Sequence, residues 1–304
     1  MTQPVFRFAP SPNGRLHLGH AYSALLNAQF AARLGGRLLL RIEDIDMTRC
    51  RPEYAAAVEE DLAWLGLRFE RPVRRQSEHF EAYRAALVGL RARGLVYPCF
   101  CTRRGILEAV ATREAALGTR APRDPDGAPL YPGTCRALSA AEATRRIAAG
   151  EPHAWRLATD AALAMAEGPL AYDRFGAAGA IESVAADPSR WGDVILGRKE
   201  IPTSYHLAVV HDDALQGITH VVRGRDLEAA TDLHVLLQRL IGLPTPLYHH
   251  HGLIEDAEGR KLAKSLGSRS LAEIRELGVT PEAIRAELGL SDATSPAPAA
   301  RGTW

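Results

Sequence analysis

The stretch VFRFAPSPNGRLHLGH (residues 5–20) predicts a strand, a turn and the start of a helix. Its first five residues are rich in types that favour strands, whereas the next six are mostly types that favour turns. Apolar side chains then recur at helical spacing from Leu16 to about Leu34, where two glycines end the helix. RLLLRIEDID (residues 37–46) follows as a buried strand that ends in acids. This βαβ pattern predicts an α/β fold built on a parallel sheet.

Composition and charge limit the classes of protein that fit. The chain has 304 residues, enough for one large domain or two ordinary ones, and its 46% hydrophobic and 24% charged residues are typical of globular proteins. The formal net charge is +1, so a nucleic-acid partner must be met by a local basic patch. No apolar run approaches the roughly 20 residues that span a bilayer, and the N-terminus lacks a signal-peptide pattern. We therefore expect no membrane partner and a reducing, cytoplasmic location for the four cysteines.

Two histidines lie at the predicted start of the first helix. His17 and His20 are three residues apart and therefore share one face of the helix. A helix N-terminus also offers free N–H groups and the positive end of the helix dipole, which together suit nucleotide phosphates. In isolation, H-x-G-H more often reflects one histidine that caps the helix and one that packs. The segment GRKLAKSLGS (residues 259–268) changes this balance, because its Lys261 and Lys264 could clamp phosphates.

Several motifs of the chain resemble those of one enzyme family. PSPNGRLHLGH (residues 10–20) is similar to the HIGH signature of class I aminoacyl-tRNA synthetases, and KLAKS (residues 261–265) is similar to their KMSKS signature. RFAPSPNGRLHLGHA, LLLRIEDID, YHLAVVHDDALQGITHVVRGRDL and YHHHGLIEDAEGRKLAKS resemble the glutamyl-tRNA synthetase branch, in order, across residues 5–265. The resemblance implies a Rossmann-like parallel sheet, a ligase activity, and ATP and L-glutamate as substrates. The chain departs from the family at Ala263, where serine is frequent, but Lys264 keeps its place.

The resemblance also implies the residues of a glutamate site. They are the end of the first strand and three residues farther along the chain, namely Arg7, Phe8, Ala9, Pro10, Ser11, Glu43, Tyr205 and Arg223. A substrate with two carboxylates and one ammonium needs guanidinium forks and one acid. We expect Glu43 to bind the ammonium and the arginines to bind carboxylates, while the Tyr205 hydroxyl orients the side chain. Outside such a set, an isolated arginine or glutamate would more often form a surface ion pair.

The catalytic residues that the resemblance implies are His17, His20, Lys261 and Lys264. ATP would bind with its phosphates over the two histidines and the helix start, accompanied by Mg²⁺. Lys264 would neutralise the charge that develops on the α-phosphate and on the departing pyrophosphate. The glutamate carboxylate would attack in line to form glutamyl-adenylate, without a covalent enzyme intermediate.

Three cysteines in the middle of the chain predict a metal site. Cys99 and Cys101 form a C-x-C pair in YPCFCTRRG, and Cys135 follows a glycine-containing turn in LYPGTCRA. Without a secretory context, this pattern favours Zn²⁺ over a disulfide, with metal-free reduced thiols as the alternative.

A tetrahedral zinc site needs a fourth ligand besides three thiolates. Residue chemistry alone leaves His153 and Asp124 as candidates, whereas the family resemblance implies Tyr131. Cys50 stands apart from the other cysteines and is expected to be structural.

Four regions follow from these motifs. Residues 1–98 are expected to form the first half of the catalytic domain, and residues 99–190 an inserted zinc-binding, acceptor-type subdomain. Residues 191–265 would complete the catalytic domain and carry the KLAKS loop. Residues 266–304 would contain two short helical segments, SLAEIRELG and TPEAIRAELG, and a flexible tail.

Three local features are also predicted. SEHFEAYRAALVGLRARG predicts a helix that is capped by Ser77 and ends before Gly94. Residues 111–129, rich in Ala, Arg, Pro and Gly, are expected to form a loop extension. The run HHH (residues 249–251) is expected to pack along a solvated sheet edge rather than to bind metal, since adjacent strand residues point to opposite faces.

The segment after KLAKS is short compared with that of glutamyl-tRNA synthetases, which carry a large helical anticodon-binding region there. Residues 266–304 are too few to build such a domain. The chain therefore resembles the truncated paralogue family of glutamyl-queuosine tRNA(Asp) synthetases, which transfer glutamate to the queuosine base of tRNA(Asp). This implies queuosine-bearing tRNA(Asp) as partner and a monomeric enzyme. The alternatives are a glutamyl-tRNA synthetase that lacks its anticodon domain and charges tRNA(Glu), a non-enzymatic RNA-binding paralogue, and another H-x-G-H nucleotidyltransferase.

Overall fold

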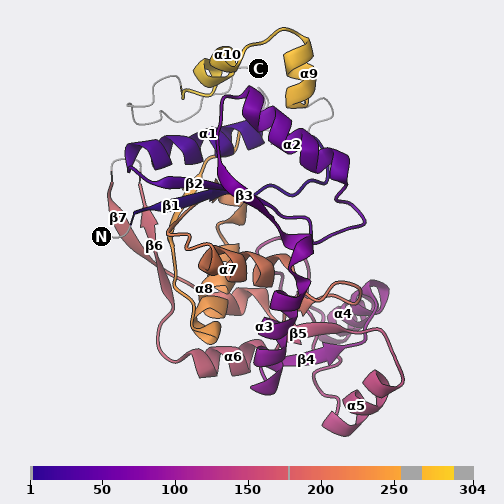
Figure 1. Ribbon diagram of the computed structural model, residues 1–304. Helices are drawn as coiled ribbons and strands as arrows, with labels where there is room; N and C mark the ends of the chain where they lie inside the picture. The colour runs from indigo at the N-terminus through magenta and orange to yellow at the C-terminus, as the bar shows by residue number, and fades with distance from the viewer. Residues whose placement is uncertain (1–2, 177–178, 255–268, 291–304) are drawn as a thin grey trace.

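The structure is a computed structural model that describes residues 3–176, 179–254 and 269–290 (Figure 1). The strands in these ranges are β1 (Val5–Phe8), β2 (Arg37–Ile42), β3 (Glu70–Arg75), β4 (Val96–Cys99), β5 (Ala154–Leu157), β6 (Ala171–Phe175), β7 (Ile181–Ala185), β8 (Ile195–Gly197), β9 (His220–Gly224) and β10 (Leu247–His251). The α-helices in these ranges are α1 (Leu18–Arg33), α2 (Pro52–Trp64), α3 (Phe80–Ala92), α4 (Arg103–Leu117), α5 (Ala140–Ala148), α6 (Thr159–Ala166), α7 (Tyr205–Leu215), α8 (Ala230–Ile241), α9 (Leu271–Glu276) and α10 (Pro281–Glu287).

The larger sheet has the strand order β3-β2-β1-β9-β10-β6-β7. Every neighbouring pair in it is parallel except β6 and β7, which are antiparallel. Helix α1 connects β1 to β2, α2 lies between β2 and β3, and α8 lies between β9 and β10. The predicted α/β fold with a mostly parallel sheet is therefore confirmed.

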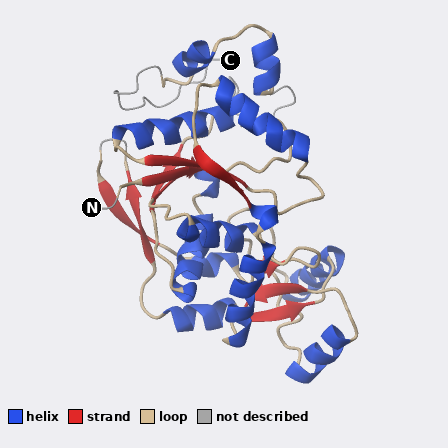
Figure 2. Ribbon diagram, viewed as in Figure 1, coloured by secondary structure: helices blue, strands red, loops and turns tan. Residues whose placement is uncertain are grey.

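Helices cover both faces of this sheet (Figures 1 and 2). Helix α1 packs on β1, β2 and β9, whereas α7 and α8 pack against each other below the strands in the figures. Phe6 and Phe8 of β1 belong to the core under α1 and α2, and Val5 belongs to the core around α7 and α8. This division follows from the alternation of side chains along a strand. The carboxyl ends of β1, β9 and β10 consequently meet at one edge, where ligands bind in such sheets.

A second, antiparallel sheet of order β4-β5-β8 lies apart from the larger one in Figure 2. Two of its strands flank the region predicted as an insert, because β4 ends at Cys99 and β8 begins at Ile195. Strands β6 and β7, although within residues 99–190, pair in the larger sheet through β10. Strand pairing thus crosses the predicted division near residue 190, and the domain boundaries stay a prediction.

The expected loop at residues 111–129 is partly wrong, because α4 extends through Leu117. Thr102 caps this helix by accepting a hydrogen bond from the Gly105 N–H at 3.0 Å. The Ala and Arg residues that contributed to the expectation of a loop are also strong helix formers. The helix ends where Gly118 adopts a left-handed conformation, with φ of 65°.

The prediction that Ser77 caps the next helix is wrong. Ser77 lies in a 3₁₀ turn (Gln76–Glu78), and its hydroxyl donates a hydrogen bond to the Asp44 carboxylate at 2.7 Å. Helix α3 begins at Phe80, and its N-cap residue His79 makes no side-chain cap. The serine is therefore used to join the end of β2 to the turn before α3.

The two predicted short helices near the C-terminus are present as α9 and α10 and lie against the α1–α2 side of the molecule (Figure 1). Leu271 and Ile274 of α9, Ile284 of α10 and the following Leu288 belong to the same core cluster as the apolar residues of α1. The Leu271 N–H donates a hydrogen bond to the Leu16 carbonyl at 2.8 Å, which ties α9 to the start of α1. The predicted tail (residues 291–304) lies outside the described residues. Across the described ranges, we find no helix with both the length and the hydropathy needed to cross a membrane.

Candidate active site and candidate metal centre

A cavity of about 470 Å³ opens at the edge where β1, β9 and β10 end. Its lining includes every residue predicted for glutamate binding and both histidines of the H-x-G-H motif. The lining residues are Arg7, Phe8, Ala9, Pro10, Ser11, His17, Gly19, His20, Ser23, Glu43, Tyr205, Val222, Arg223, Gly224, Asp226, Leu227, His251, Leu253 and Ile254. The fold therefore brings together segments as far apart in the chain as Arg7 and Ile254. The predicted catalytic Lys261 and Lys264 lie outside the described residues.

The two histidines form a reciprocal cap at the start of α1. His17 Nδ1 accepts a hydrogen bond from the Gly19 N–H at 3.1 Å, and His20 Nδ1 accepts one from the His17 N–H at 3.2 Å. In a neutral imidazole whose Nδ1 accepts, the proton is on Nε2. The histidines can therefore cap the helix and bind a ligand at the same time. Each ring caps through Nδ1 and keeps an Nε2–H donor for a ligand.

Burial keeps these imidazoles neutral. It lowers the pKa of His17, and it lowers the pKa of His20 to about 3 with a further contribution from His17. A Cβ at Gly19 would meet the His17 ring at 3.0 Å, so glycine permits the tight packing of this cap. Neutral Nε2–H donors and the free N–H groups of the helix start would all favour an anionic group in the cavity.

Arg223, at the end of β9, is held from several directions. Its Nη2 donates to the Thr231 hydroxyl at 2.8 Å, and its Nη1 lies 3.2 Å from His234 Nδ1 and 3.4 Å from the Tyr205 hydroxyl. Its Nε lies 3.4 Å from His250 Nε2. Neutral partners hold the guanidinium in place without cancelling its charge. The cation therefore stays available to a carboxylate in the cavity.

Sequence reasoning missed the partners Thr231 and His234, which come from α8. No motif marks them, and both are buried. The run HHH was expected to pack, and His249 and His250 do contact the rings of Phe30 and Tyr248. The expectation of a solvated edge is wrong, because β10 lies between β9 and β6 in the interior of the sheet.

Arg7 and Glu43 come from neighbouring strand ends. Arg7 Nε donates to Asp213 Oδ1 at 3.1 Å, and Arg41 Nη2 donates to Glu43 Oε1 at 2.9 Å. Burial raises the pKa of Glu43 above its ordinary value, against the opposing charges of Arg41 and Arg7. A buried carboxylate of this kind gains strongly from an ammonium partner.

The histidines around Arg223 make acid sensitivity a testable property. Burial and then the charge of Arg223 lower the pKa of His206 to about 4 and of His250 to about 3, and they hold that of His234 well below 6.5. Below pH 6.5 the unfolded chain therefore binds more protons than the folded one. We expect the free energy of unfolding to fall as pH drops from about 6.5 towards 4, by about 1.4 kcal/mol per pH unit for each excess proton.

This expectation is checked by calorimetric Tm measured at several pH values. The variant His206→Phe keeps an aromatic ring but removes one titrating group. Its Tm should fall less steeply between pH 6.5 and 4 than that of the wild type. Equal slopes would show that His206 does not contribute to the acid sensitivity.

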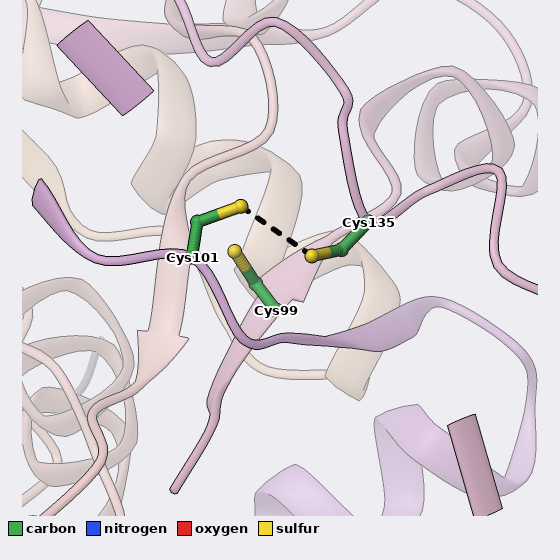
Figure 3. Close-up of side chains that lie close together, drawn as sticks. All are labelled: Cys99, Cys101 and Cys135. Atoms are coloured by element: carbon green, nitrogen blue, oxygen red, sulfur yellow. Dashed lines mark hydrogen bonds between the residues drawn. The ribbon is translucent and has the colours of Figure 1, made fainter. Parts of the chain in front are cut away.

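The three cysteines predicted to bind metal converge between β4 and the turn after residue 130 (Figure 3). The Sγ atoms of Cys99, Cys101 and Cys135 all lie within 4.8 Å of one another, and those of Cys101 and Cys135 are 3.4 Å apart. The Tyr131 hydroxyl lies 3.3 Å from Cys99 Sγ and 3.5 Å from Cys101 Sγ. Four possible ligand atoms thus lie close together.

These distances fit a tetrahedral ion. Zinc bonds of about 2.3 Å to sulfur and about 2.0 Å to oxygen imply sulfur–sulfur distances of roughly 3.8 Å and sulfur–oxygen distances of roughly 3.5 Å. Neither residue-based alternative for the fourth ligand belongs to the cluster, and each has another partner. His153 Nδ1 contacts the Glu151 carbonyl, and Asp124 accepts from the Ala128 N–H. Among the described His, Asp and Glu residues, none joins the cysteine cluster. The cluster could hold one metal ion.

A buried guanidinium lies beside this cluster. The Arg156 guanidinium carbon is 3.9 Å from the centre of the Tyr131 ring, and its Nη1 donates to the Asp193 carbonyl at 2.6 Å. Three thiolates around a divalent cation carry net negative charge, so a nearby fixed cation stabilises such a cluster.

Comparisons with known proteins agree with this geometry. Residues 4–297 match the family described as "tRNA synthetases class I (E and Q), catalytic domain". The chain is 44% identical to a Rhodobacter capsulatus protein named glutamyl-Q tRNA(Asp) synthetase, over 94% of this chain and 100% of that protein. It is 40% identical to glutamate–tRNA ligase 2 of Nitrosococcus oceani, over 91% of this chain and 57% of that protein.

A solved structure has the same fold. The glutamate tRNA ligase of Elizabethkingia meningosepticum, crystallised with its amino acid, superposes with a TM-score of 0.67 at 26% identity. The superposition covers 91% of this chain and 54% of the ligase, so the chain spans about half the length of that structure. The fold class predicted from the HIGH-like and KMSKS-like motifs is therefore confirmed.

Proposed function

Because the chain belongs to the class I tRNA synthetases of the glutamyl and glutaminyl branch, we propose that it activates L-glutamate with ATP and transfers the glutamyl group to the queuosine base of tRNA(Asp). The observation that carries the proposal is the single cavity in which a helix start with two neutral histidines meets Arg7, Glu43 and Arg223. One end suits phosphates, and the other suits a small molecule that carries both signs of charge.

In the proposed complex, Glu43 accepts hydrogen bonds from the substrate ammonium, and Arg7 and Arg223 bind its two carboxylates. The Tyr205 hydroxyl, next to Arg223, orients the side chain of the substrate. Phe8, Ala9, Pro10 and Ser11 line the cavity beside them. Charges of both signs in one cavity would select an α-amino acid that has a second carboxylate.

ATP would place its phosphates at the start of α1, where His17 and His20 offer Nε2–H donors. Lys264, with Lys261 beside it in the chain, would neutralise the α-phosphate and the leaving pyrophosphate, and bound Mg²⁺ would share that charge. The substrate carboxylate attacks the α-phosphate, pyrophosphate leaves, and glutamyl-adenylate remains. A hydroxyl of the modified base then attacks the activated carboxyl carbon, and AMP leaves.

We propose Zn²⁺ as the ion of the cysteine cluster, held by Cys99, Cys101, Cys135 and Tyr131. When bound, it supplies a cross-link between β4 and the loop that leads to α5, rather than chemistry at the substrate. It would thereby stabilise the small sheet that lies next to α3. The enzyme is proposed to act as a cytoplasmic monomer.

The choice of tRNA rests on the relatives. A relative covered along its whole length is named for tRNA(Asp), whereas the glutamate–tRNA ligase matches over 57% of its own length. The second candidate, charging of tRNA(Glu), is kept because that relative is nearly as similar.

The deciding experiment offers the pure enzyme radiolabelled glutamate and ATP with three RNAs: tRNA(Asp) that carries queuosine, the same tRNA without it, and tRNA(Glu). Label is expected only on the queuosine-bearing tRNA(Asp). Glutamate-dependent ATP–pyrophosphate exchange, measured without any tRNA, reports the first step separately. Charging of tRNA(Glu) alone would establish the second candidate, and lack of any exchange would contradict glutamate activation.

A further inference from the structure

Two groups of opposite charge, Arg7 and Glu43, line the same cavity and yet form no ion pair with each other. Each is instead paired with a residue behind the cavity wall. Arg7 is paired with Asp213 of α7, and Glu43 is paired with Arg41 of β2. Neither Asp213 nor Arg41 lines the cavity.

The two rear residues are also bonded to each other. Arg41 Nη1 donates to Asp213 Oδ1 at 2.7 Å, while Arg7 Nε and Nη2 donate to the two oxygens of the same carboxylate at 3.1 and 3.4 Å. Arg41 Nη2 and Nε reach Glu43 Oε1 at 2.9 and 3.3 Å. The order of charges along this line is therefore Arg7, Asp213, Arg41, Glu43, alternating in sign.

The rear pair is deeply buried, with exposed fractions of 0% for Arg41 and 5% for Asp213. Burial acts to raise the pKa of Asp213, but the guanidiniums of Arg7 and Arg41 outweigh it and hold that pKa below its ordinary value. Removal of one member of such a pair leaves an uncompensated charge in a site of low polarity. Loss of a single charge is therefore expected to destabilise the network.

Without the rear pair, the shortest way to satisfy Arg7 and Glu43 would be a direct ion pair between them. Such a pair would cancel the two charges that the substrate must meet. We propose that Asp213 and Arg41 are positioning residues of the glutamate site, which hold Arg7 and Glu43 apart so that both remain free to bind the substrate. This inference rests on the proposed function, because it assumes that the cavity binds glutamate.

The next residue of the same helix provides a matched control. Asp212 has an exposed fraction of 0% and accepts hydrogen bonds from Tyr83 at 2.7 Å and Gln76 at 3.0 Å, besides an ion pair with Arg74 at 2.9 Å. None of these contacts reaches Arg7 or Glu43. Loss of its charge should therefore disturb stability without changing the binding of glutamate.

The test compares Asp213→Asn with Asp212→Asn in glutamate-dependent ATP–pyrophosphate exchange, and records the Tm of each variant. Asp213→Asn is expected to raise KM for glutamate by about 100-fold, since a displacement of about 1 Å in a positioned group has effects of that size. Its KM for ATP should stay at the wild-type value. Asp212→Asn is expected to lower Tm and to leave both KM values unchanged.

A double variant, Arg41→Met with Asp213→Asn, separates a loss of glutamate binding from a loss of folding. Replacing both members of a buried ion pair by neutral residues of similar shape is often tolerated by the fold. This variant should stay folded, yet Arg7 and Glu43 should pair directly, so KM for glutamate should rise as in Asp213→Asn. A wild-type KM for glutamate in the folded double variant, or an equal rise in KM for ATP, would overturn the positioning role.

The proposed function fails in a different way. Absence of glutamate-dependent exchange in the wild-type enzyme would contradict glutamate activation itself, and the positioning role with it. If the wild type is active and the double variant keeps the wild-type KM for glutamate, only the positioning role is contradicted.

Discussion

Replacement of Arg223 by lysine is expected to lower kcat/KM for glutamate in ATP–pyrophosphate exchange by roughly 100- to 1000-fold. Truncating one partner of a buried, hydrogen-bonded charge pair costs about 2–5 kcal/mol, and lysine is a point charge that cannot reproduce a guanidinium fork. Arg223 is buried and bonded through three nitrogens to Thr231, His234, His250 and Tyr205. Lysine at this position would leave several of these partners unsatisfied as well as misplacing the cation.

The control for this change is Arg225→Lys, two residues along the chain. Arg225 is exposed and does not line the cavity. The Arg225→Lys variant should retain the wild-type kcat/KM for glutamate. Steady-state exchange at varied glutamate and varied ATP separates the two substrates, and an effect on the ATP dependence alone would contradict the role of Arg223 in binding glutamate.

Replacement of Cys101 by serine is expected to release the metal from the middle of the chain and to lower Tm sharply. Cys101 Sγ lies 3.4 Å from Cys135 Sγ and 3.5 Å from the Tyr131 hydroxyl, so its loss removes the ligand that joins the two. Because binding at a structural site is coupled to folding, the free energy of metal binding is lost from stability. Elemental analysis should change from about one zinc per chain to nearly none.

Two further variants make this result specific. Cys50→Ser changes the cysteine outside the cluster and should keep the full zinc content. Tyr131→Phe keeps all three thiolates and removes only the hydroxyl, so it should retain zinc but release it to a chelator more readily. An unchanged zinc content in Cys101→Ser would contradict the assignment of the cluster. An unchanged affinity for zinc in Tyr131→Phe would show that another group is the fourth ligand.

Local sequence predicted where Arg7 and Glu43 lie, whereas their roles in the candidate site came from the family resemblance. Arg7 and Glu43 end neighbouring strands of one βαβ unit, and parallel strands bring their carboxyl ends to one edge. The cysteines were found by their spacing, which reflects the geometry that a tetrahedral ion requires. Tyr205 and Arg223 could be named only through the family resemblance, because neither carries a local signal.

The wrong predictions arise where one local pattern fits two structures. Ser77 has the composition of a helix cap, but the Asp44 carboxylate competes for its hydroxyl and N–H. The Ala- and Arg-rich residues 111–117 suggested a loop, although the same residue types favour helix once Thr102 caps it. The HHH run gave no sign of whether its strand was an edge or an interior strand, since that depends on which strands pair with it.

The amino-acid sequence by itself determined the parallel βαβ unit, the histidine-bearing helix start, the cysteine-bearing motifs and the family, because each is carried by short motifs of particular residue types. Only the tertiary structure decided what lies behind the site. Helix α7 packs beneath the strand ends and places Asp213 against both Arg7 and Arg41, the partner of Glu43 on β2. Helix α8 places Thr231 and His234 against Arg223. Burial is what makes these contacts matter, since a charge removed from water must find its partners within the protein. Residue spacing does not show which partners a buried charge will find, because those partners are brought together only when the chain packs.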